Sequence, residues 1–294
     1  MILRPVLLSF FTLFIILFSS CSSEKTVTPD APTTEPETEE PEEEPTWQLV
    51  WEDEFDGEVL DMEKWSYELG DGCEISVNLC GWGNNELQYY TEREENISVE
   101  DGFLTITAHE EDFEGSEYTS ARIRTFNKGD WQFGRIEIRA KLPQGQGIWP
   151  AIWMLPTDEN FGGWPQSGEI DIMELVGHEP ETVHGTIHFG EVWPNNKYSG
   201  KDYSLDSGIF ADNYHVFSIE WEEDRIQFFV DGNRFFTVTP STVSEQTTKP
   251  YPFNERFHMI LNIAVGGNWP GNPDSTTEFP QTMSVDYVRV YQFK

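Results

Sequence analysis

Three carboxylic acids stand close together in one short segment, and their spacing is the strongest chemical signal in the sequence. Glu169 and Asp171 alternate with aliphatic residues, so in a β-strand they point to one face while their neighbours enter the core. Regular alternation would turn Glu174 to the core side. We expect a β-bulge around Ile172 and Met173 that returns Glu174 to the face of the other acids, because bulges re-aim side chains and are enriched beside active sites.

Two carboxyl groups on one face can hydrolyse a glycosidic bond. A retaining glycosidase uses one ionised and one protonated carboxyl group roughly 5–5.5 Å apart. Four effective strand steps separate the Cα atoms of Glu169 and Glu174 by about 13 Å, a gap that two long side chains leaning together can close. Closely spaced carboxylates do not all ionise, so one pKa rises and that group can serve as the acid. An edge strand with a solvated acidic face is the alternative.

Aromatic side chains, 14% of the sequence, often lie next to Gly, Pro or Asn instead of inside strand-like runs. Flat rings suit the apolar faces of sugars, and Asn, Glu and Arg side chains suit their hydroxyl groups, so this composition favours a neutral polysaccharide as ligand. A core position is the alternative for each ring, but Trp164 adjoins the acidic segment, which favours ligand contact. The rings in this setting are Trp82, Tyr89, Tyr90, Trp149, Trp153, Trp164, Trp193 and Trp269.

His184 and His188 share one face of the strand expected over residues 183–189, which we expect to pair with the acidic strand. That pairing would let His188 touch the acid/base carboxyl group, and a structural hydrogen bond is the alternative. The sequence contains no Gly-x-Ser-x-Gly elbow and no P-loop, which argues against a serine esterase or a nucleotide-dependent enzyme.

The first residues predict export. Arg4 precedes an apolar run over 6–18 that is short for a membrane span of about 20 residues, and two serines then lead to Cys21. This ending resembles a bacterial lipobox, with Phe18 in place of the usual Leu. The resemblance implies a signal peptide over 1–21, lipidation of Cys21 and anchoring to a bacterial outer membrane or cell surface. Ordinary secretion is the alternative.

Residues 22–46 are dominated by Pro, Thr, Ser and Glu. Such a segment has too little apolar surface to offset the entropy of ordering, so we expect an extended, self-repelling tether that holds a domain away from a surface. Residues 47–294 follow, and their length of about 250 residues is compatible with one all-β domain.

Strand-like runs recur through residues 47–294, separated by turn signals such as Asp231-Gly232. No stretch shows sustained helical periodicity, although a short turn is expected over 241–246. The pattern predicts two packed antiparallel sheets with a groove on one of them. Besides the acidic segment, strands are expected over 47–55, 103–109, 120–126, 131–141, 148–154, 183–189, 214–221, 225–230, 234–239, 257–265 and 283–293.

The formal net charge of −35 disfavours nucleic acid as a partner, since phosphate binding needs Lys and Arg, and it disfavours a strongly sulfated or carboxylated ligand. With Cys21 assigned to the signal, Cys73 and Cys80 remain as a pair in an exported chain. A disulfide between them is favoured over two free thiols or a metal held by two cysteines alone.

The six residues 169–174 (Glu-Ile-Asp-Ile-Met-Glu) match the E-x-D-x-x-E active-site pattern of glycoside hydrolase family 16, in the bulged form found in laminarinases. The resemblance extends over nearly all of residues 47–294. Further blocks that resemble the family lie at 51–56, 81–90, 118–124, 147–154 and 284–291.

The resemblance implies a β-jelly-roll sandwich of two antiparallel sheets with a concave substrate groove, and a retaining endo-1,3-β-glucanase. Glu169 would be the nucleophile and Glu174 the general acid/base, with Asp171 between them tuning their protonation. No cofactor is required for this chemistry. Between the two arginines that share a face, Arg122 is preferred over Arg124 for the groove. The implied substrate contacts are Asn84, Glu86, Arg122, Trp149, Trp153, Trp164, His188 and Trp269.

The laminarinase-like block at 81–86 points to β-1,3-glucan as the polysaccharide partner. Mixed-linkage β-glucan or a marine galactan, transfer to a sugar acceptor, and a non-catalytic carbohydrate-binding protein are the alternatives. We expect a monomer that meets the membrane through its lipid anchor only. Members of the family often carry a structural calcium on the convex side, and the matching positions are Glu54, Gly102 through its backbone carbonyl, and Asp286.

Overall fold

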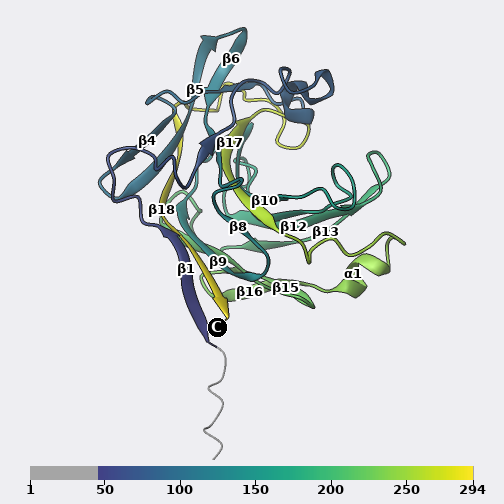
Figure 1. Ribbon diagram of the computed structural model, residues 1–294. Coiled ribbons are helices and arrows are strands. Elements are labelled where there is room, and N and C mark those ends of the chain that lie inside the picture. Colours follow the sequence, from purple (N-terminus) through teal and green to yellow (C-terminus); the bar gives the residue numbers. More distant parts are fainter. Residues whose placement is uncertain (1–45, 294) are drawn as a thin grey trace, which may run out of the picture. The chain divides into compact units, whose positions relative to one another are not determined.

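A computed structural model describes residues 46–293 of the chain (Figure 1). The predicted signal peptide, its Cys21 and tether residues 22–45 lie outside the described residues, as does Lys294. No helix within residues 46–293 has the length and apolar character that crossing a membrane needs.

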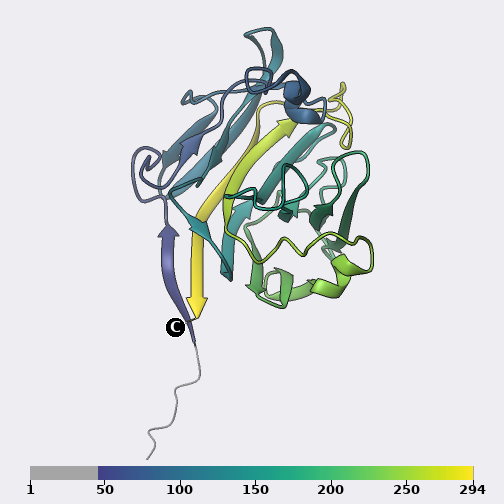
Figure 2. The ribbon, with the colours of Figure 1, turned by 45° about the vertical axis from the view of Figure 1, so that its right-hand side comes forward.

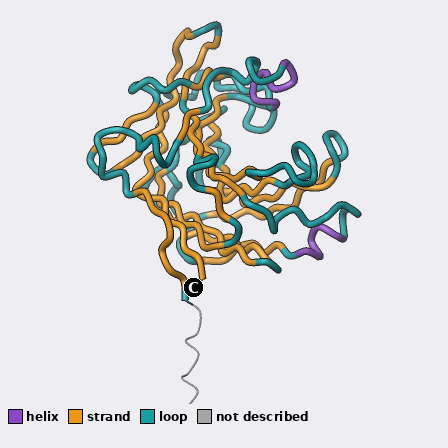
Figure 3. The backbone as a smooth tube through the Cα atoms, in the orientation of Figure 1, coloured by secondary structure: helices purple, strands orange, loops and turns teal. Residues whose placement is uncertain are grey.

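Two β-sheets pack face to face (Figures 1 and 3). The first sheet follows the order β16-β15-β14-β9-β18-β5-β6-β3, with β1 added beside β18 and β4 beside β5. Its strands are β1 (Trp47–Asp53), β3 (Gln88–Tyr90), β4 (Ile97–Glu100), β5 (Phe103–Phe113), β6 (Ser116–Ser120), β9 (Gly134–Lys141), β14 (His215–Glu222), β15 (Arg225–Val230), β16 (Asn233–Val238) and β18 (Gln281–Phe293).

The second sheet carries the acidic segment as its strand β11. Its order is β13-β12-β11-β10-β17-β7-β2, with β8 beside β17. Figure 3 shows in purple the short helices η1 (Val77–Gly83) and α1 (Pro240–Ser244), the second of which matches the expected turn. The strands are β2 (Ser66–Tyr67), β7 (Arg122–Arg124), β8 (Asp130–Trp131), β10 (Ile148–Pro156), β11 (Glu169–Glu174), β12 (Thr182–Gly190), β13 (Asn196–Ser204) and β17 (Phe257–Val265).

The predicted all-β jelly-roll sandwich is confirmed. Neighbouring strands run antiparallel, except that β3 and β6 of the described chain pair in parallel. Figure 2 shows the first strand, β1, beside the last, β18, and their register runs from Trp47 opposite Phe293 to Asp53 opposite Val288. The chain therefore enters and leaves the sandwich on the sheet that does not carry β11.

Two predicted strands are divided between the sheets. The run 131–141 becomes β8 in the second sheet and β9 in the first, because Phe133, between the two strands, takes a left-handed conformation (φ 64°) that interrupts the extended chain. The run 120–126 likewise divides into β6, which ends at Ser120, and β7, which starts at Arg122. Strand β13 was missed, because it is a mostly exposed, polar edge strand without an alternating apolar pattern.

The core lies between the two sheets. Ile152 of β10 stands opposite Leu261 of β17, and both are fully buried. Phe217 and Ile219 of β14 are buried from the other sheet. Burial of such side chains stabilises the fold by about 1.5–3 kcal/mol each relative to exposure. On β10, β11 and β17, the side chains that alternate with these core residues point to the other face of the second sheet, away from the first sheet.

Cys73 and Cys80 form a disulfide, the pairing favoured from the sequence. Cys80 lies within η1, and the next two residues, Gly81 and Trp82, both have positive φ values, of 61° and 52°. The Trp82 indole donates a hydrogen bond back to the carbonyl of Gly70 at 3.2 Å. The Trp82 ring is therefore held directly after the disulfide, against the chain that precedes the closed loop.

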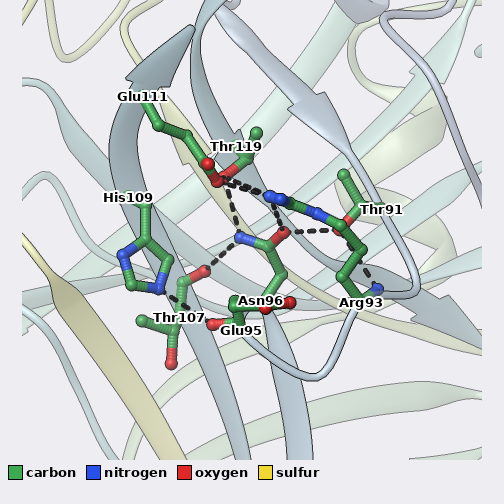
Figure 4. Close-up of polar contacts among 8 residues, drawn as sticks. All are labelled: Thr91, Arg93, Glu95, Asn96, Thr107, His109, Glu111 and Thr119. Atoms are coloured by element: carbon green, nitrogen blue, oxygen red, sulfur yellow. Dashed lines mark hydrogen bonds and ion pairs between the residues drawn. The ribbon is translucent and has the colours of Figure 1, made fainter. Parts of the chain in front are cut away.

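A buried polar cluster joins the loop before β4 to strands β5 and β6 (Figure 4). Fully buried Asn96 donates to the Thr107 carbonyl at 3.1 Å and to Thr119 Oγ1 at 2.9 Å. Its Oδ1 accepts hydrogen bonds from Arg93, at 3.0 Å, and from Thr91. Because every polar atom of the amide is used, this side chain ties three segments together.

We predict that Asn96→Ala lowers the free energy of unfolding by about 2 kcal/mol, because it leaves buried partners without hydrogen bonds. Urea unfolding of the purified protein measures the change. The control is Asn233→Ala at an exposed position, which should alter stability by less than about 0.5 kcal/mol. Equal losses in the two variants would contradict the structural role assigned to the cluster.

Candidate active site

Strand β11 contains the expected bulge. On the side of β10, Asp171 stands opposite Trp153 and Met173 opposite Ile152, so Ile172 has no partner of its own. Ile172 and Met173 are consecutive, yet both belong to the hydrophobic core. One extra residue on β11 therefore reverses the alternation between Asp171 and the end of the strand.

The bulge places all three acids on one face. On the side of β12, Glu169 stands opposite His188 and Glu174 opposite His184, and the register shifts between Asp171 and Glu174. Residues directly opposite each other point to the same face of a sheet. The predicted arrangement of the three carboxylates is therefore confirmed, although the chemical role of each rests on further argument.

Glu169 lies between an indole and an imidazole. Its Oε2 accepts a hydrogen bond from Trp164 Nε1 at 2.8 Å. His188 Nε2 is 3.7 Å from Glu169 Oε1 and 3.4 Å from Asp171 Oδ2. The prediction that His188 touches Glu174 was wrong, because the register sets His188 opposite the first acid of β11 and not the last.

Glu174 lies in a different aromatic setting. Its Oε1 accepts a hydrogen bond from Trp149 Nε1 at 3.0 Å. The Trp149 ring meets Trp269 edge to face, with centroids 5.6 Å apart, and Trp269 meets His184 at 4.9 Å. His184 is oriented by Asp202, whose Oδ1 is 2.9 Å from His184 Nδ1.

The two glutamates differ in how firmly they hold a proton. Burial and the Asp171 charge raise the pKa of Glu169 to about 7, opposed by His188, the Trp164 hydrogen bond and Arg122. Burial, then the charges of Asp171 and Glu169, raise the pKa of Glu174 well above its usual range despite His188 and Trp149. Glu169 is therefore the easier group to ionise.

His188 supplies positive charge to the cluster. Burial opposes its protonation, but the adjacent Asp171 and the charges of Glu169 and Glu174 outweigh burial and raise the pKa of His188 to about 10. The imidazole is therefore charged at neutral pH. Its positive charge partly balances the negative charge of the acids on this mostly buried face.

Arg122 supports the neighbouring part of the site through aromatic rings. Only 7% exposed, it places its guanidinium carbon 4.3 Å from the centre of the Trp82 ring and 4.8 Å from that of Trp153. Its Nε donates to Glu68 Oε2 at 2.5 Å. The Trp153 indole in turn donates to Asn262 Oδ1 at 2.8 Å. Arg122 thus holds two rings in place and presents little of its charge to solvent.

Glu86 is the centre of a second polar group. It accepts hydrogen bonds from Asn84 at 3.2 Å, Gln88 at 2.8 Å and Tyr90 at 3.4 Å. Asn262 donates to the Tyr90 hydroxyl at 3.1 Å, which joins this group to Trp153. Burial raises the pKa of Glu86, opposed by the Arg122 charge and these hydrogen bonds.

The structure brings Trp149, Trp164, His188 and Trp269 to the acids, and Arg122, Trp153, Glu86 and Asn84 to the adjoining networks. The sequence did not single out Asn262 as part of the site. A signal was present, since Asn262 is one of two polar residues in the otherwise apolar segment Phe257–Val265. For Glu68 and Asp202, which act through long-range contacts, no comparable signal exists.

The predicted calcium residues belong to the first sheet. The carboxylate of Glu54 accepts hydrogen bonds from Arg289 at 2.6 and 2.8 Å, and Asp286 is paired with Arg139. Gly102 lies in the turn between β4 and β5. Neither side-chain carboxylate is therefore free to turn to a cation, so these side chains do not fit a calcium site as they stand, and calcium stays a prediction.

A β-sandwich with two carboxyl groups of unequal pKa on one strand, and tryptophan side chains bonded to each, defines a two-carboxylate glycoside hydrolase. The chain belongs to glycosyl hydrolases family 16, whose model matches residues 84–289. The predicted family is thereby confirmed.

Curated relatives of the chain support the same family. The chain is 45% identical to "Glucan endo-1,3-beta-glucosidase A1" of Niallia circulans over 256 residues, which are 83% of this chain but 38% of that protein. It is also 45% identical to "Beta-glucanase" of Rhodothermus marinus, covering 83% of this chain and 85% of that protein. The chain thus spans less than half of the first relative and most of the second.

Among solved structures, the laminarinase catalytic domain from Thermotoga maritima superposes with a TM-score of 0.78 at 46% identity, covering 84% of this chain and 98% of that one. The laminarinase from Rhodothermus marinus superposes with a TM-score of 0.76 at 44% identity, covering 85% and 99%. The predicted resemblance to laminarinases is confirmed in sequence and in fold.

We predict that Asp171→Asn shifts the basic limb of the pH–activity profile to lower pH and lowers kcat. The basic limb reports loss of the proton that the catalytic acid must donate, and the Asp171 charge raises the pKa of Glu174. Removing that charge lowers this pKa, so the proton is lost at a lower pH. Measuring kcat/KM against pH tests the sign.

The matched control for this experiment is Asp158→Asn, which removes an acid that is paired with Arg256 on the surface. Its profile should coincide with that of the wild type. A basic limb that stays in place or moves upward in Asp171→Asn would contradict the electrostatic argument.

Proposed function

We propose that the protein is a retaining endo-1,3-β-glucanase that hydrolyses laminarin-type β-1,3-glucan. The observation that carries the proposal is the bulge in β11, which sets Glu169 and Glu174 on one face with unequal pKa values. The relatives named above support the choice of substrate, because they are called laminarinases or 1,3-β-glucosidases.

In the first step, ionised Glu169 attacks the anomeric carbon while Glu174 gives its proton to the glycosidic oxygen. The leaving part of the chain departs, and an ester joins Glu169 to the sugar. In the second step Glu174 accepts a proton from water, which attacks the same carbon and releases Glu169 as a carboxylate. No cofactor takes part in either step.

The coupling between the acids suits this exchange of roles. The Glu169 charge is one of the causes that raise the pKa of Glu174. Ester formation removes that charge, so the pKa of Glu174 falls when the group must change from acid to base. The Trp164 hydrogen bond favours the ionised form of Glu169 before the attack.

Two tryptophans are placed to meet the sugar directly. Trp164 and Trp269 are each 44% exposed; Trp164 donates to Glu169, and Trp269 packs against Trp149, which donates to Glu174. Exposed rings at these positions can cover the apolar faces of sugars on both sides of the scissile bond. Arg122 acts on the substrate through the Trp82 and Trp153 rings that it holds.

We predict that Glu169→Ser lowers kcat on laminarin by roughly three orders of magnitude or more, because the variant lacks the nucleophile. New reducing ends measure the rate, and thermal unfolding checks that the variant is folded. Added azide should restore cleavage and give a glycosyl azide of α configuration, since it attacks the face that Glu169 has vacated. Retention of more than a few per cent of wild-type turnover would show that another group is the nucleophile.

We predict that the wild-type enzyme releases reducing ends fastest from laminarin within a panel of laminarin, lichenan, agarose and carrageenan. The initial product of laminarin should have the β configuration by NMR, because two displacements retain it. Faster release from lichenan or agarose would replace the substrate proposal and leave the mechanism intact. An initial α product would refute the mechanism itself.

We also propose that the enzyme is exported as a monomeric lipoprotein held by Cys21 and the tether. The position of β1 supports this arrangement, because the tether joins a strand of the first sheet whereas the acids lie on the second.

We predict that Cys21→Ser moves the enzyme from the membrane fraction to the soluble fraction of a bacterial host that lipidates exported proteins, since the variant has no thiol to acylate. Activity in the two fractions and incorporation of labelled fatty acid measure the effect. Substitution of the neighbouring Ser22 by Ala is the control and should leave the enzyme in the membrane fraction. Unchanged fractionation of Cys21→Ser would refute lipidation at this residue.

A further inference from the structure

A histidine and two carboxylates meet at one point of the catalytic face. His188 Nε2 lies 3.4 Å from Asp171 Oδ2 and 3.7 Å from Glu169 Oε1. One ligand atom from each of these three residues falls within 4.8 Å of the others. Imidazole nitrogen and carboxylate oxygen are both atoms that bind divalent metal ions. The three side chains can therefore close around an ion when no sugar is bound.

The spacing of these atoms matches the coordination shell of zinc. Zinc binds histidine nitrogen and carboxylate oxygen at about 2.0–2.2 Å, so the ligand atoms of a tetrahedral site lie about 3.3–3.6 Å apart. The two distances from His188 Nε2, 3.4 and 3.7 Å, lie in or close to this range. Only a small movement of the side chains is therefore needed to admit the ion.

Asp171 has a carboxylate oxygen that no other group uses. The residue is 3% exposed, and its Oδ2 accepts no hydrogen bond from any residue of the described chain. A buried carboxylate oxygen without a hydrogen-bond partner is costly. A cation bound between this oxygen and His188 Nε2 removes that cost. The group therefore differs from an ordinary acidic surface cluster, whose oxygens are satisfied by water.

The site is open on one side. The side chains of His188 and Glu169 are 24% and 14% exposed, so an ion can enter from solvent. Trp164 donates to Glu169 Oε2, which leaves Oε1 to face the ion. Water takes the remaining coordination position, as it does in zinc sites with three protein ligands.

We propose that Glu169, Asp171 and His188 bind Zn²⁺ and that the bound ion inhibits the enzyme reversibly. The ligand atoms are Glu169 Oε1, Asp171 Oδ2 and His188 Nε2. The ion displaces the proton from Nε2 to solvent, so one proton leaves for each ion bound. Glu169 then has no free oxygen with which to attack an anomeric carbon. The inhibition rests on the proposed function, whereas the binding rests on the geometry of the three side chains.

The ligand set favours zinc over calcium and magnesium, because calcium and magnesium prefer oxygen ligands and an imidazole nitrogen suits zinc. In a resident zinc site, the other ring nitrogen of a ligating histidine normally has a hydrogen-bond partner. His188 Nδ1 is buried and has no such partner within residues 46–293. We therefore expect an ion that a chelator removes, and not a permanent metal centre.

Calorimetric titration of the purified, metal-free protein with zinc chloride tests the site. His188→Gln removes one ligand and should raise the zinc Kd by roughly a hundredfold or more, since loss of an outer partner alone typically costs roughly 10- to 100-fold. The matched control is His184→Gln, because His184 faces the same side of β12 and is also paired with an acid, Asp202. It should bind zinc as the wild type does. Thermal unfolding checks that both variants are folded.

Co²⁺ provides a spectroscopic measurement that does not depend on activity. Bound in place of zinc, it should give the visible absorption of a four- or five-coordinate ion in the wild type and in His184→Gln, but not in His188→Gln. In assays, zinc should raise KM for laminarin and leave kcat unchanged, and EDTA should restore the original KM. Calcium or magnesium at the same concentration should change neither value.

Zinc binding that is lost in His184→Gln and kept in His188→Gln would overturn the site, as would binding that neither substitution changes. Inhibition that lowers kcat at constant KM, or equal inhibition by calcium, would also overturn it. If the wild type hydrolysed no glycan, the proposed function would fail, and the zinc titration and the cobalt spectrum would still decide on the metal site.

Discussion

The repulsion among three carboxyl groups on one mostly buried face is the constraint on which the site depends. Glu169 and Glu174 resist ionisation there, because burial and the charge of the neighbouring acids both favour their protonated forms. The surrounding side chains oppose this rise in pKa to different extents at the two glutamates. Charged His188 and a tryptophan indole favour the ionised form of each glutamate, but the pKa of Glu169 rises only to about 7, whereas that of Glu174 rises well above its usual range. A proton donor and an anion can therefore coexist on one strand.

The bulge makes that division possible, and the sandwich makes the bulge stable. Ile172 and Met173 both enter the core, so returning to regular alternation would expose one of them or bury Glu174. Hydrophobic packing thus maintains an arrangement that electrostatics alone opposes. The same packing sets the register with β12, which brings a histidine opposite each glutamate.

The features that could be predicted from the sequence are those that depend on neighbouring residues along the chain. Parity within residues 169–174 required the bulge, and the runs of apolar residues located most strands. Strand β13 escaped because an exposed edge strand needs no apolar pattern, and the division at Phe133 depended on backbone angles. The predicted partner of His188 was wrong. The partner depends on the register between β11 and β12, and the alternation of side chains along each strand does not determine that register.

The remaining contacts connect segments far apart in the chain, and they explain why the site needs the whole sandwich. Arg122 lies between Trp82, carried by η1, and Trp153, carried by β10. Trp153 is also tied through Asn262 of β17 to the group around Glu86. Each ring is thus contacted from two sides, Trp82 by Arg122 and the Gly70 carbonyl, and Trp153 by Arg122 and Asn262. A surface held in this way keeps its shape before substrate arrives, so little ordering entropy opposes binding beside acids whose protonation is already set.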